Sequence, residues 1–529
     1  MKRTYLFLLL LIPALLLAQG LQQSIPGDPI PEDEYEEAEG SSYGLTGRVG
    51  TVTHNGLSYS QVRLMPEFNL GKFGFGLDID FLIDAQGKIY KENWDDWEDY
   101  LNKIFYIRYG GRRDPYYFMA GCIPDYTLGH GLIFDHYSNM LRYPSSKNVG
   151  AYAGVNTPIS GLGFEAFTHN IHKNQILAAR AHINPLDYTG IPMLQNVKIG
   201  LNIGLDRNQY GKYEDEDDDN VPDIYDRFPN DKDVWLDSDQ DGLADDQDFD
   251  LDGDGAIDHP DLNPWVASNF SNPDIIDVYP DFPFDADVFP DVATMYPKAS
   301  ELTIYSLDYV LPLVANDLFY LDHYGEYAKI DKHGSGIIFP GFSSKFFIFD
   351  AKFEFRNFAD NFIPGYFDRL YDEQRTQVRI VQDSLNTVYS LYTKEDLIDQ
   401  SKAALGWFGY LKANIANFGY VKVAYQDMYG EGMTTGKSLW ANVTANPKAI
   451  EKLKEASIYY SQTHARYIDF IHPRTNSAAL SGRVVYGVSE TTDMIARYSE
   501  TYSDINGDGK IKGEDEIISS FAIGVEFRF

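Results

Sequence analysis

Side chains along much of this chain alternate between apolar residues and polar or small ones, as in a β-strand with two different faces. The last nine residues, FAIGVEFRF, show this clearly, because every second residue from Phe521 to Phe529 is apolar. The intervening positions are polar or small: Ala522, Gly524, Glu526 and Arg528. Alternating segments recur through most of the chain and predict an all-β fold.

Three further segments, GKFGFGLDIDFLI, NVKIGLNIGLD and KFFIFDAKFEFRN, repeat the alternation, and in the last of them the apolar positions run from Phe347 to Phe355. In a closed barrel the opposite face would line the lumen. Its polar residues are Asp78, Asp80, Lys198, Asn202, Asp350, Lys352, Glu354 and Arg356. Their charges are mixed, so the pattern indicates no preference for anions or cations.

Two fold classes share this pattern: a soluble sandwich with its apolar face inward, and a transmembrane barrel with its apolar face toward lipid. Long strands and a 15% aromatic content, with 39 Tyr and 33 Phe, favour the barrel, whose interface girdles are aromatic. Only a closed barrel crosses lipid with strands, because every backbone polar group must be paired. We therefore predict a transmembrane antiparallel β-barrel of about 20 strands, within a range of roughly 16 to 22.

The two ends of the chain resemble those of bacterial outer-membrane barrels. MKRTYLFLLLLIPALLLAQG has the charged start and apolar core of a secretory signal, cleaved after residue 18. The chain ends in an alternating strand with a terminal Phe529, and in that class the last strand is the signal for the insertion machinery. The resemblance implies the outer membrane of a Gram-negative-type bacterium, with membrane lipid and the insertion machinery as partners.

Short and long connections alternate along the chain, as they do in barrels with short periplasmic turns and long outer loops. This count places an acidic insert after the ninth strand, on the outside. It places the long link at 357–405 on the outside as well. The expected parts are the signal at 1–18, a disordered acidic lead-in at 19–40, barrel strands at 41–212, the insert at 213–292 and barrel strands at 293–529.

Some connections carry other patterns. Helical spacing predicts short helices around Trp94, Trp97, Leu101 and Ile104, and around Ile450, Leu453 and Ala456. The segment CIPDYTLGHGLIFDHYSNMLRYP, which begins at Cys122, is compatible with an outer loop or a constriction inside the barrel, and we interpret it as an outer loop. Cys122 is the only cysteine, which excludes an internal disulfide.

The net charge of −35 is concentrated in one region. Residues 214–291 contain 27 Asp and Glu but only two basic residues, Arg227 and Lys232. The acidity therefore belongs to the insert, and nucleic acid is not an expected partner.

Three units in the insert share the pattern D-x-D-x-D-[GN]-x-x-D-x-x-D. Alternate carboxylates converge on one cation when Gly or Asn allows a sharp turn, and hard oxygen ligands favour Ca²⁺ over zinc. The alternative is a disordered acidic tract. The candidate ligands are Asp215, Asp217, Asp219, Asp223 and Asp226; Asp237, Asp239, Asp241, Asp245 and Asp248; and Asp250, Asp252, Asp254, Asp258 and Asp261.

Residues 215–264 resemble the thrombospondin type 3 repeat, including Pro229 and Pro264 after the first and third units. The resemblance implies a row of calcium ions wrapped by a peptide with little hydrophobic core. The third unit begins two residues after the second ends, closer than the 22-residue step before it, so a shared or incomplete site is expected there.

A further calcium loop is predicted at 504–515, in SDINGDGKIKGEDE. Its residues match positions 1, 3, 5, 6, 7 and 12 of an EF-hand loop, and an Asp at the last position resembles a dockerin loop. The matching residues are Asp504, Asn506, Asp508, Gly509, the Lys510 carbonyl and Asp515.

No nucleophile elbow, P-loop or HExxH motif is present, and His130 and His136 lack the spacing of paired metal ligands, so the protein is not expected to be an enzyme. The leading hypothesis is an outer-membrane channel for small solutes with calcium-stiffened outer loops. The alternative is a surface adhesion or ligand-binding protein, in which the barrel is an anchor and the insert contacts an extracellular ligand.

Overall fold

The structure is a computed structural model that describes two long stretches of the chain, 41–211 and 301–528, Pro26, and some positions from 217 to 244. The gaps within the two stretches are 55–56, 92–93, 95–96, 141–147, 192, 317–318, 383–386, 416–417, 432, 434–435, 446–451, 469–477, 503–510 and 512–516. The chain divides into two compact units. The barrel unit comprises Met1–Leu205, Thr303–Tyr371 and Ile398–Phe529, and the insert unit comprises Asp206–Leu302 and Asp372–Leu397.

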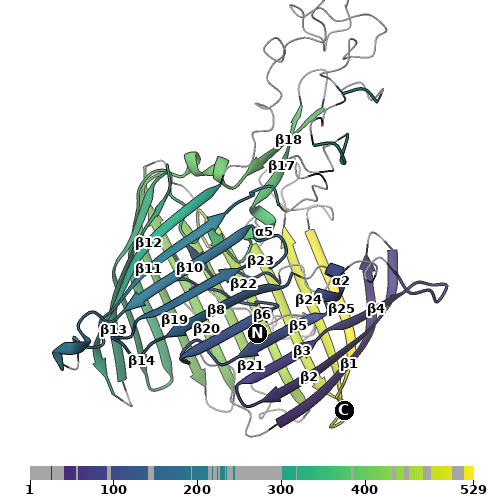
Figure 1. Cartoon of the computed structure of the whole chain (residues 1–529), viewed down its shortest axis with the longest axis horizontal. Helices are drawn as coiled ribbons and strands as arrows, with labels where there is room; N and C mark the ends of the chain where they lie inside the picture. The colour runs from purple at the N-terminus through teal and green to yellow at the C-terminus, as the bar shows by residue number, and fades with distance from the viewer. Residues whose placement is uncertain are drawn as a thin grey trace, which may run out of the picture. The chain divides into compact units, whose positions relative to one another are not determined.

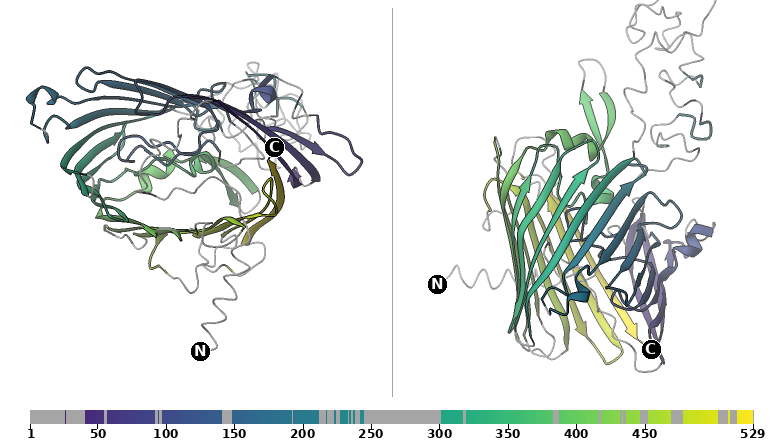
Figure 2. Two further views of the ribbon diagram at one scale, coloured as in Figure 1. Left: turned by 90° about the horizontal axis from the view of Figure 1, so that it is seen from below. Right: turned by 60° about the vertical axis from the view of Figure 1, so that its left-hand side comes forward.

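The barrel unit is one antiparallel sheet closed on itself (Figures 1 and 2). Its first strands are β1 Ser41–His54, β2 Leu57–Leu70, β3 Phe73–Leu77, β4 Ile79–Ile83, β5 Ile104–Tyr109, β6 Tyr116–Gly121, β8 Gly150–Asn156, β9 Gly163–Thr168, β10 Ile176–Ile183 and β11 Lys198–Asp206. The others are β12 Leu302–Ala315, β13 Phe319–Ile330, β14 Ser335–Phe346, β15 Phe349–Phe358, β19 Ala404–Ile415, β20 Gly419–Tyr429, β21 Lys437–Ala445, β22 Leu453–Ala465, β23 Ala478–Gly487, β24 Thr492–Tyr502 and β25 Ile517–Arg528.

Pairing of β1 with β25, from Thr46↔Arg528 to Val49↔Val525, closes the sheet. Of its 21 described strands, β3 and β4 both pair with β2 as successive halves of one crossing, which leaves 20 crossings. The predicted all-β antiparallel barrel is therefore confirmed. Counted in crossings, β11 is the ninth, and the connection that contains the acidic insert follows it.

The two faces of the barrel differ as the alternation predicts. In β11, Leu201 is 61% exposed whereas its neighbour Asn202 is 5% exposed. In β25, Phe521 and Ile523 are exposed and Glu526 is buried. Because successive side chains of a strand point to opposite faces, the apolar residues lie outside and the polar ones inside.

The described helices are short: α2 Trp97–Leu101, the 3₁₀ helix Asp187–Thr189, α5 Tyr371–Gln374 and the 3₁₀ helix Glu395–Gln400. The first predicted helix is present only as α2, which contains Trp97 and Leu101, because Trp94 precedes it and Ile104 begins β5. The predicted helix that includes Leu453 and Ala456 is wrong. Both residues belong to β22, which pairs with β21 and β23, and Ile450 lies outside the described residues. No helix in the described stretches is long and apolar enough to cross a membrane.

The predicted alternation from Phe347 onward also contains a turn. β14 ends at Phe346 and β15 begins at Phe349, so Phe347 and Ile348 form the hairpin connection between them. Phe347 has a left-handed φ of 51° and is exposed. The alternation itself holds from Phe349, because a two-residue turn preserves the period of two.

The insert unit includes a hairpin of β17 Thr376–Gln382 and β18 Thr387–Thr393. Just before it, the Arg375 guanidinium donates to both carboxylate oxygens of Asp206, at 2.8 and 2.7 Å, and both side chains are buried. This ion pair joins the two segments of the insert unit.

Candidate functional site

Residues 122–140, here called the inner strap, fold into the barrel, so their interpretation as an outer loop is wrong. Many of the apolar side chains of the strap are buried, among them those of Tyr126, Ile133 and Phe134. The left view of Figure 2 shows chain segments crossing the inside of the barrel. The physical reason is the composition of the strap, since so many apolar side chains would be costly to expose in an outer loop.

Hydrogen bonds between the Asn139 side chain and the backbone hold the base of the strap. The Asn139 amide donates to the carbonyl oxygens of Gly121, Asn148 and His169 at 3.2, 3.0 and 3.1 Å, and its Oδ1 accepts from the Ile123 N–H at 2.7 Å. One buried side chain thus satisfies backbone groups from several segments and fixes where the strap leaves the wall.

Residues 359–371, here called the inner brace, fold against the strap. The short strand β16 (Phe367–Asp368) of the brace pairs in parallel with β7 (Phe134–Asp135) of the strap. The Phe134 and Phe367 rings stack with centroids 4.4 Å apart, and the N–H of Gly365 donates to the Leu132 carbonyl oxygen at 3.0 Å. Strap and brace therefore form one packed layer inside the barrel.

The wall beneath this layer contains glycine where the aromatic side chains approach. A Cβ on Gly204 of β11 would lie 2.7 Å from Ile133 Cγ2, 2.9 Å from Phe134 Cε2 and 3.1 Å from Phe367 Cε2. A Cβ on Gly336 of β14 would collide with the Phe362 ring. Both positions need glycine so that the strap and brace can reach the sheet.

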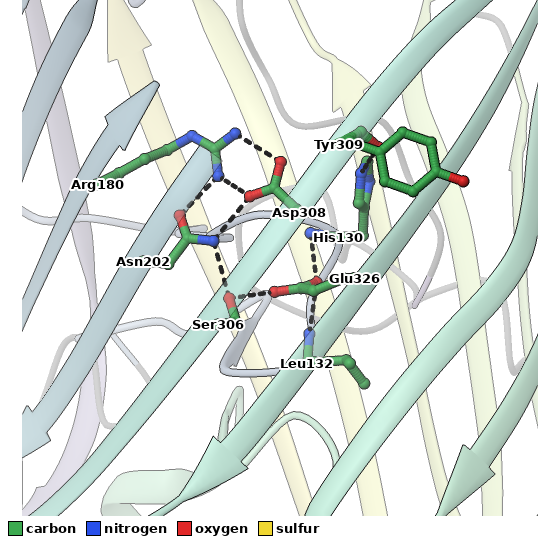
Figure 3. Close-up of polar contacts among 8 residues, drawn as sticks. All are labelled: His130, Leu132, Arg180, Asn202, Ser306, Asp308, Tyr309 and Glu326. Atoms are coloured by element: carbon green, nitrogen blue, oxygen red, sulfur yellow. Dashed lines mark hydrogen bonds and ion pairs between the residues drawn. The ribbon is translucent and has the colours of Figure 1, made fainter. Parts of the chain in front are cut away.

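A buried polar network crosses four neighbouring strands of the same wall, as Figure 3 shows. The Arg180 guanidinium of β10 donates to both oxygens of Asp308 in β12, with Nη2–Oδ1 at 2.9 Å, and to Asn202 Oδ1 in β11 at 2.6 Å. The Asn202 amide in turn donates to Asp308 Oδ2 at 2.7 Å and to Ser306 Oγ at 2.8 Å. The Ser306 hydroxyl donates to Glu326 Oε1 of β13 at 2.6 Å.

The last group of this network binds the tip of the strap. Glu326 Oε2 accepts the backbone N–H of His130 at 2.7 Å and that of Leu132 at 3.3 Å (Figure 3). Gly129 adopts a left-handed φ of 62°, and a Cβ there would lie 2.7 Å from Glu326 Oε1. The carboxylate therefore receives three hydrogen bonds, two of them from the strap backbone.

His130, which lacks the spacing of a paired metal ligand in the sequence, completes this contact. Its ring stacks on Tyr324 with centroids 4.3 Å apart, and its Nε2–H donates to the Tyr309 carbonyl oxygen at 3.3 Å. Burial lowers the pKa of His130 below its usual value of 6.5. The tip is thus fixed by backbone hydrogen bonds and ring stacking together.

A second carboxylate, Glu165 of β9, binds the strap nearer its base. Glu165 Oε1 accepts from the Tyr126 hydroxyl at 3.0 Å and from Arg112 Nη2 at 2.9 Å. The Arg112 guanidinium lies 4.7 Å from the centroid of the Tyr126 ring and 5.0 Å from that of Tyr152. Burial raises the pKa of the Tyr126 phenol well above its usual value, so that it stays a hydrogen-bond donor.

Of the predicted calcium ligands, only Asp217, Asp223 and Asp237 are among the described residues. The predicted ligands outside them are Asp215, Asp219, Asp226, Asp239, Asp241, Asp245, Asp248, Asp250, Asp252, Asp254, Asp258, Asp261, Asp504, Asn506, Asp508, Lys510 and Asp515. Within the described part of the chain, no group of three or more His, Cys, Asp or Glu side chains is arranged to hold a metal ion.

Asp237, the first position of the second predicted unit, does fit a cation ligand. Its Oδ2 accepts the N–H of Gly242 at 3.1 Å, and Gly242 has the left-handed φ, 94°, expected at position six. Asp237 is 8% exposed, and its Oδ1 has no hydrogen-bond partner among the described residues. A buried carboxylate oxygen without a donor is suited to a cation.

The sequence identified part of this site. Asn202 was predicted to face the lumen and does, but Arg180, Ser306, Asp308 and Glu326 were not singled out. Their signal is present in the sequence, since each lies on the polar side of an alternating strand. The partners of these side chains come from residues far apart in the chain, which alternation does not reveal.

No protein-family model matches the chain, and no curated protein matches it in sequence. The chain is similar in structure to Pseudomonas aeruginosa OccK2 (OpdF), solved in complex with glucuronate, at 7% identity and a TM-score of 0.30 over 94% of this chain and 99% of that chain. It is also similar to Pseudomonas aeruginosa OprD, at 9% identity and a TM-score of 0.30 over 94% and 97%. A third similar structure is Pseudomonas aeruginosa OpdQ, at 8% identity and a TM-score of 0.31 over 92% of this chain and 97% of that chain. These values are low, so the fold of this chain rests on its own strand pairing.

Proposed function

We propose that the protein is an outer-membrane channel that passes small solutes through a constriction formed by the inner strap and inner brace. The observation that carries this proposal is the wall itself: apolar outside, polar inside, with two segments packed against its inner face. A barrel of about 20 strands encloses a lumen wide enough for water, so inward segments set the width of the path.

The connectivity supports an orientation for this channel. The two-residue turn at 347–348 lies at one end of the barrel, whereas β6, β11 and β15, the strands that precede the strap, the insert and the brace, all end at the opposite end. In outer-membrane barrels the short turns face the periplasm and the long connections face outward. On this basis we infer that the insert lies on the outside of the cell.

Single-channel recording tests the proposal. Purified full-length protein, refolded in detergent and shown to be β-rich by circular dichroism, is added to a planar lipid bilayer. Steady steps of current are expected. Folded protein that gives no current, and that does not admit small sugars into vesicles, would overturn the channel proposal.

We further propose that the insert binds Ca²⁺ through its aspartate units, with Asp237 as one ligand. Extracellular calcium modules bind at ~10⁻⁴–10⁻³ M, a range in which such sites are occupied outside cells. Isothermal titration calorimetry of the full-length protein should show calcium binding, with fewer sites after Asp237→Ala. Equal binding of magnesium, or no loss of sites in the variant, would contradict it.

A surface-binding protein is the second candidate, and the dense packing of the strap and brace favours it. Their aromatic side chains are buried, as in a barrel whose lumen is plugged. An adhesion protein predicts that binding to cells or matrix is lost when 214–291 is deleted, whereas a channel predicts that conductance survives the same deletion.

A further inference from the structure

We infer that Glu326 is the positioning residue of the constriction, a latch that holds the tip of the inner strap against β13 and so sets the width of the path. The inference rests on the proposed channel only for its effect on current. Its structural part, that Glu326 holds the backbone of the tip, stands on the hydrogen bonds of Glu326 to the N–H groups of His130 and Leu132.

The base and the tip of the strap are held differently. At the base, the Asn139 amide binds three carbonyl oxygens, and backbone N–H and carbonyl groups of Tyr126 and Tyr137 bond to one another in both directions, at 2.8 and 3.0 Å. At the tip, among the residues that the structure describes, the backbone N–H groups bonded to the wall are those of His130 and Leu132, and both donate to Glu326 Oε2. The backbone of the tip is thus bonded to the wall through one carboxylate, and the His130 ring adds its stack on Tyr324 and its bond to the Tyr309 carbonyl oxygen.

The tip also has the backbone freedom to move. Gly129 and Gly131 flank His130 and have φ values of 62° and 98°, a conformation that glycine adopts without strain. Two glycines around the bonded residue allow the tip to swing from the wall while the base remains attached.

Glu326 is itself held in place by the rest of the wall network. The Ser306 hydroxyl donates to its Oε1, and Ser306 is positioned by Asn202. Asn202 also bonds to Arg180 and Asp308, so a rigid set of four strands presents the carboxylate. The wall network therefore keeps the Glu326 carboxylate in place, and the glycine-flanked tip is the part that can move away from it.

Thiol labelling of the full-length protein in lipid vesicles tests the inference. The reporter is Leu128→Cys, a buried strap position, in a Cys122→Ser background, with a membrane-impermeant maleimide as the probe. Glu326→Leu should raise the labelling rate about tenfold or more, because one lost bond to a charged group changes an opening equilibrium by that factor. Glu326→Gln retains an acceptor oxygen and should give a smaller increase.

Two controls separate release of the tip from loosening of the whole barrel. The first is a reporter at Ala424→Cys, a buried wall position of β20 that packs on Phe408 and Tyr410; its labelling should not change. The second is Glu455→Leu, which removes a wall carboxylate paired with Arg483 at 2.6 Å and should leave the Leu128→Cys rate unchanged. Circular dichroism checks that every variant is folded.

Faster labelling at position 128 alone, with larger single-channel current in Glu326→Leu, supports the latch. Unchanged labelling at position 128 overturns it, because the strap is then held by Glu165 and the brace. Equal increases at positions 128 and 424 also overturn it, since the barrel as a whole has loosened. Faster labelling with no current in either wild type or variant retains the latch and refutes the channel.

Discussion

Replacing Arg180 with methionine should destabilise the barrel strongly, because the Asp308 carboxylate would remain buried without its cation. Asp308 is 1% exposed, and Arg180 donates to both of its oxygens. After the substitution only the Asn202 amide still donates to it among the bonds of this network. Removing one partner of a buried ion pair costs about 3–5 kcal/mol, which is the loss we expect for Arg180→Met.

The assay is urea unfolding of the protein reconstituted in lipid vesicles, followed by tryptophan fluorescence. The double variant Arg180→Met with Asp308→Leu should recover most of the loss, because an apolar pair replaces the buried ions at little net cost. Arg207 and Glu301 provide an exposed comparison, with side chains 55% and 63% exposed and 3.8 Å between their charged atoms. Arg207→Met should cost no more than about 1 kcal/mol.

A loss below about 1 kcal/mol for Arg180→Met, equal to that of the exposed pair, would refute this reasoning. It would show that water in the lumen solvates Asp308, so that the polar network is hydrated rather than shielded from water. The same result would weaken the latch, because Glu326 is held by the same network through Ser306 and Asn202.

Three further predictions follow from other contacts. Burial holds the pKa of His130 below 6.5, so the strap bound to the wall takes up fewer protons than the released strap. Binding of the tip should therefore weaken as the pH falls below 6.5, which hydrogen exchange would detect as faster exchange of the amides at the tip. His130→Gln should remove this pH dependence. Gly204→Leu should cost about 1–3 kcal/mol by overpacking against Ile133, measured by thermal unfolding, and an unchanged midpoint would contradict the packed layer. Arg375→Ala leaves the buried Asp206 carboxylate without its cation, so limited proteolysis should cut within 372–397 while the barrel stays intact; cutting no faster than in wild type would contradict a structural role for the pair.

Much of the barrel could be predicted because alternation is a local property of a strand. A period of two reports which face is apolar without knowledge of any partner, so the exposure of Leu201 and Phe521 and the burial of Asn202 and Glu526 follow from the sequence. The same property gives the strand count, since each crossing needs its own alternating segment.

The errors arose where short patterns have two interpretations. Leu453 and Ala456 are three residues apart, which suits a helix, but pairing with β21 and β23 places both in a strand. Phe347 continues an alternating run and yet lies in a turn, because the two-residue connection keeps the period intact. Sheet pairing is decided by residues distant in sequence, so tertiary contacts override these local signals.

The inward strap could have been recognised from the wall that it packs on. The inner face of β11 reads Gly200, Asn202, Gly204 and Asp206. A wall that faced only water would have no need of glycine there, and glycine weakens a strand. A Cβ at 204 would lie 2.7 Å from Ile133, and one at 200 would lie 2.7 Å from the Arg180 guanidinium carbon. Glycines that alternate with polar residues on an inward face therefore indicate that large side chains pack closely there; at Gly200 they come from the neighbouring strands, and at Gly204 they come from the strap and the brace.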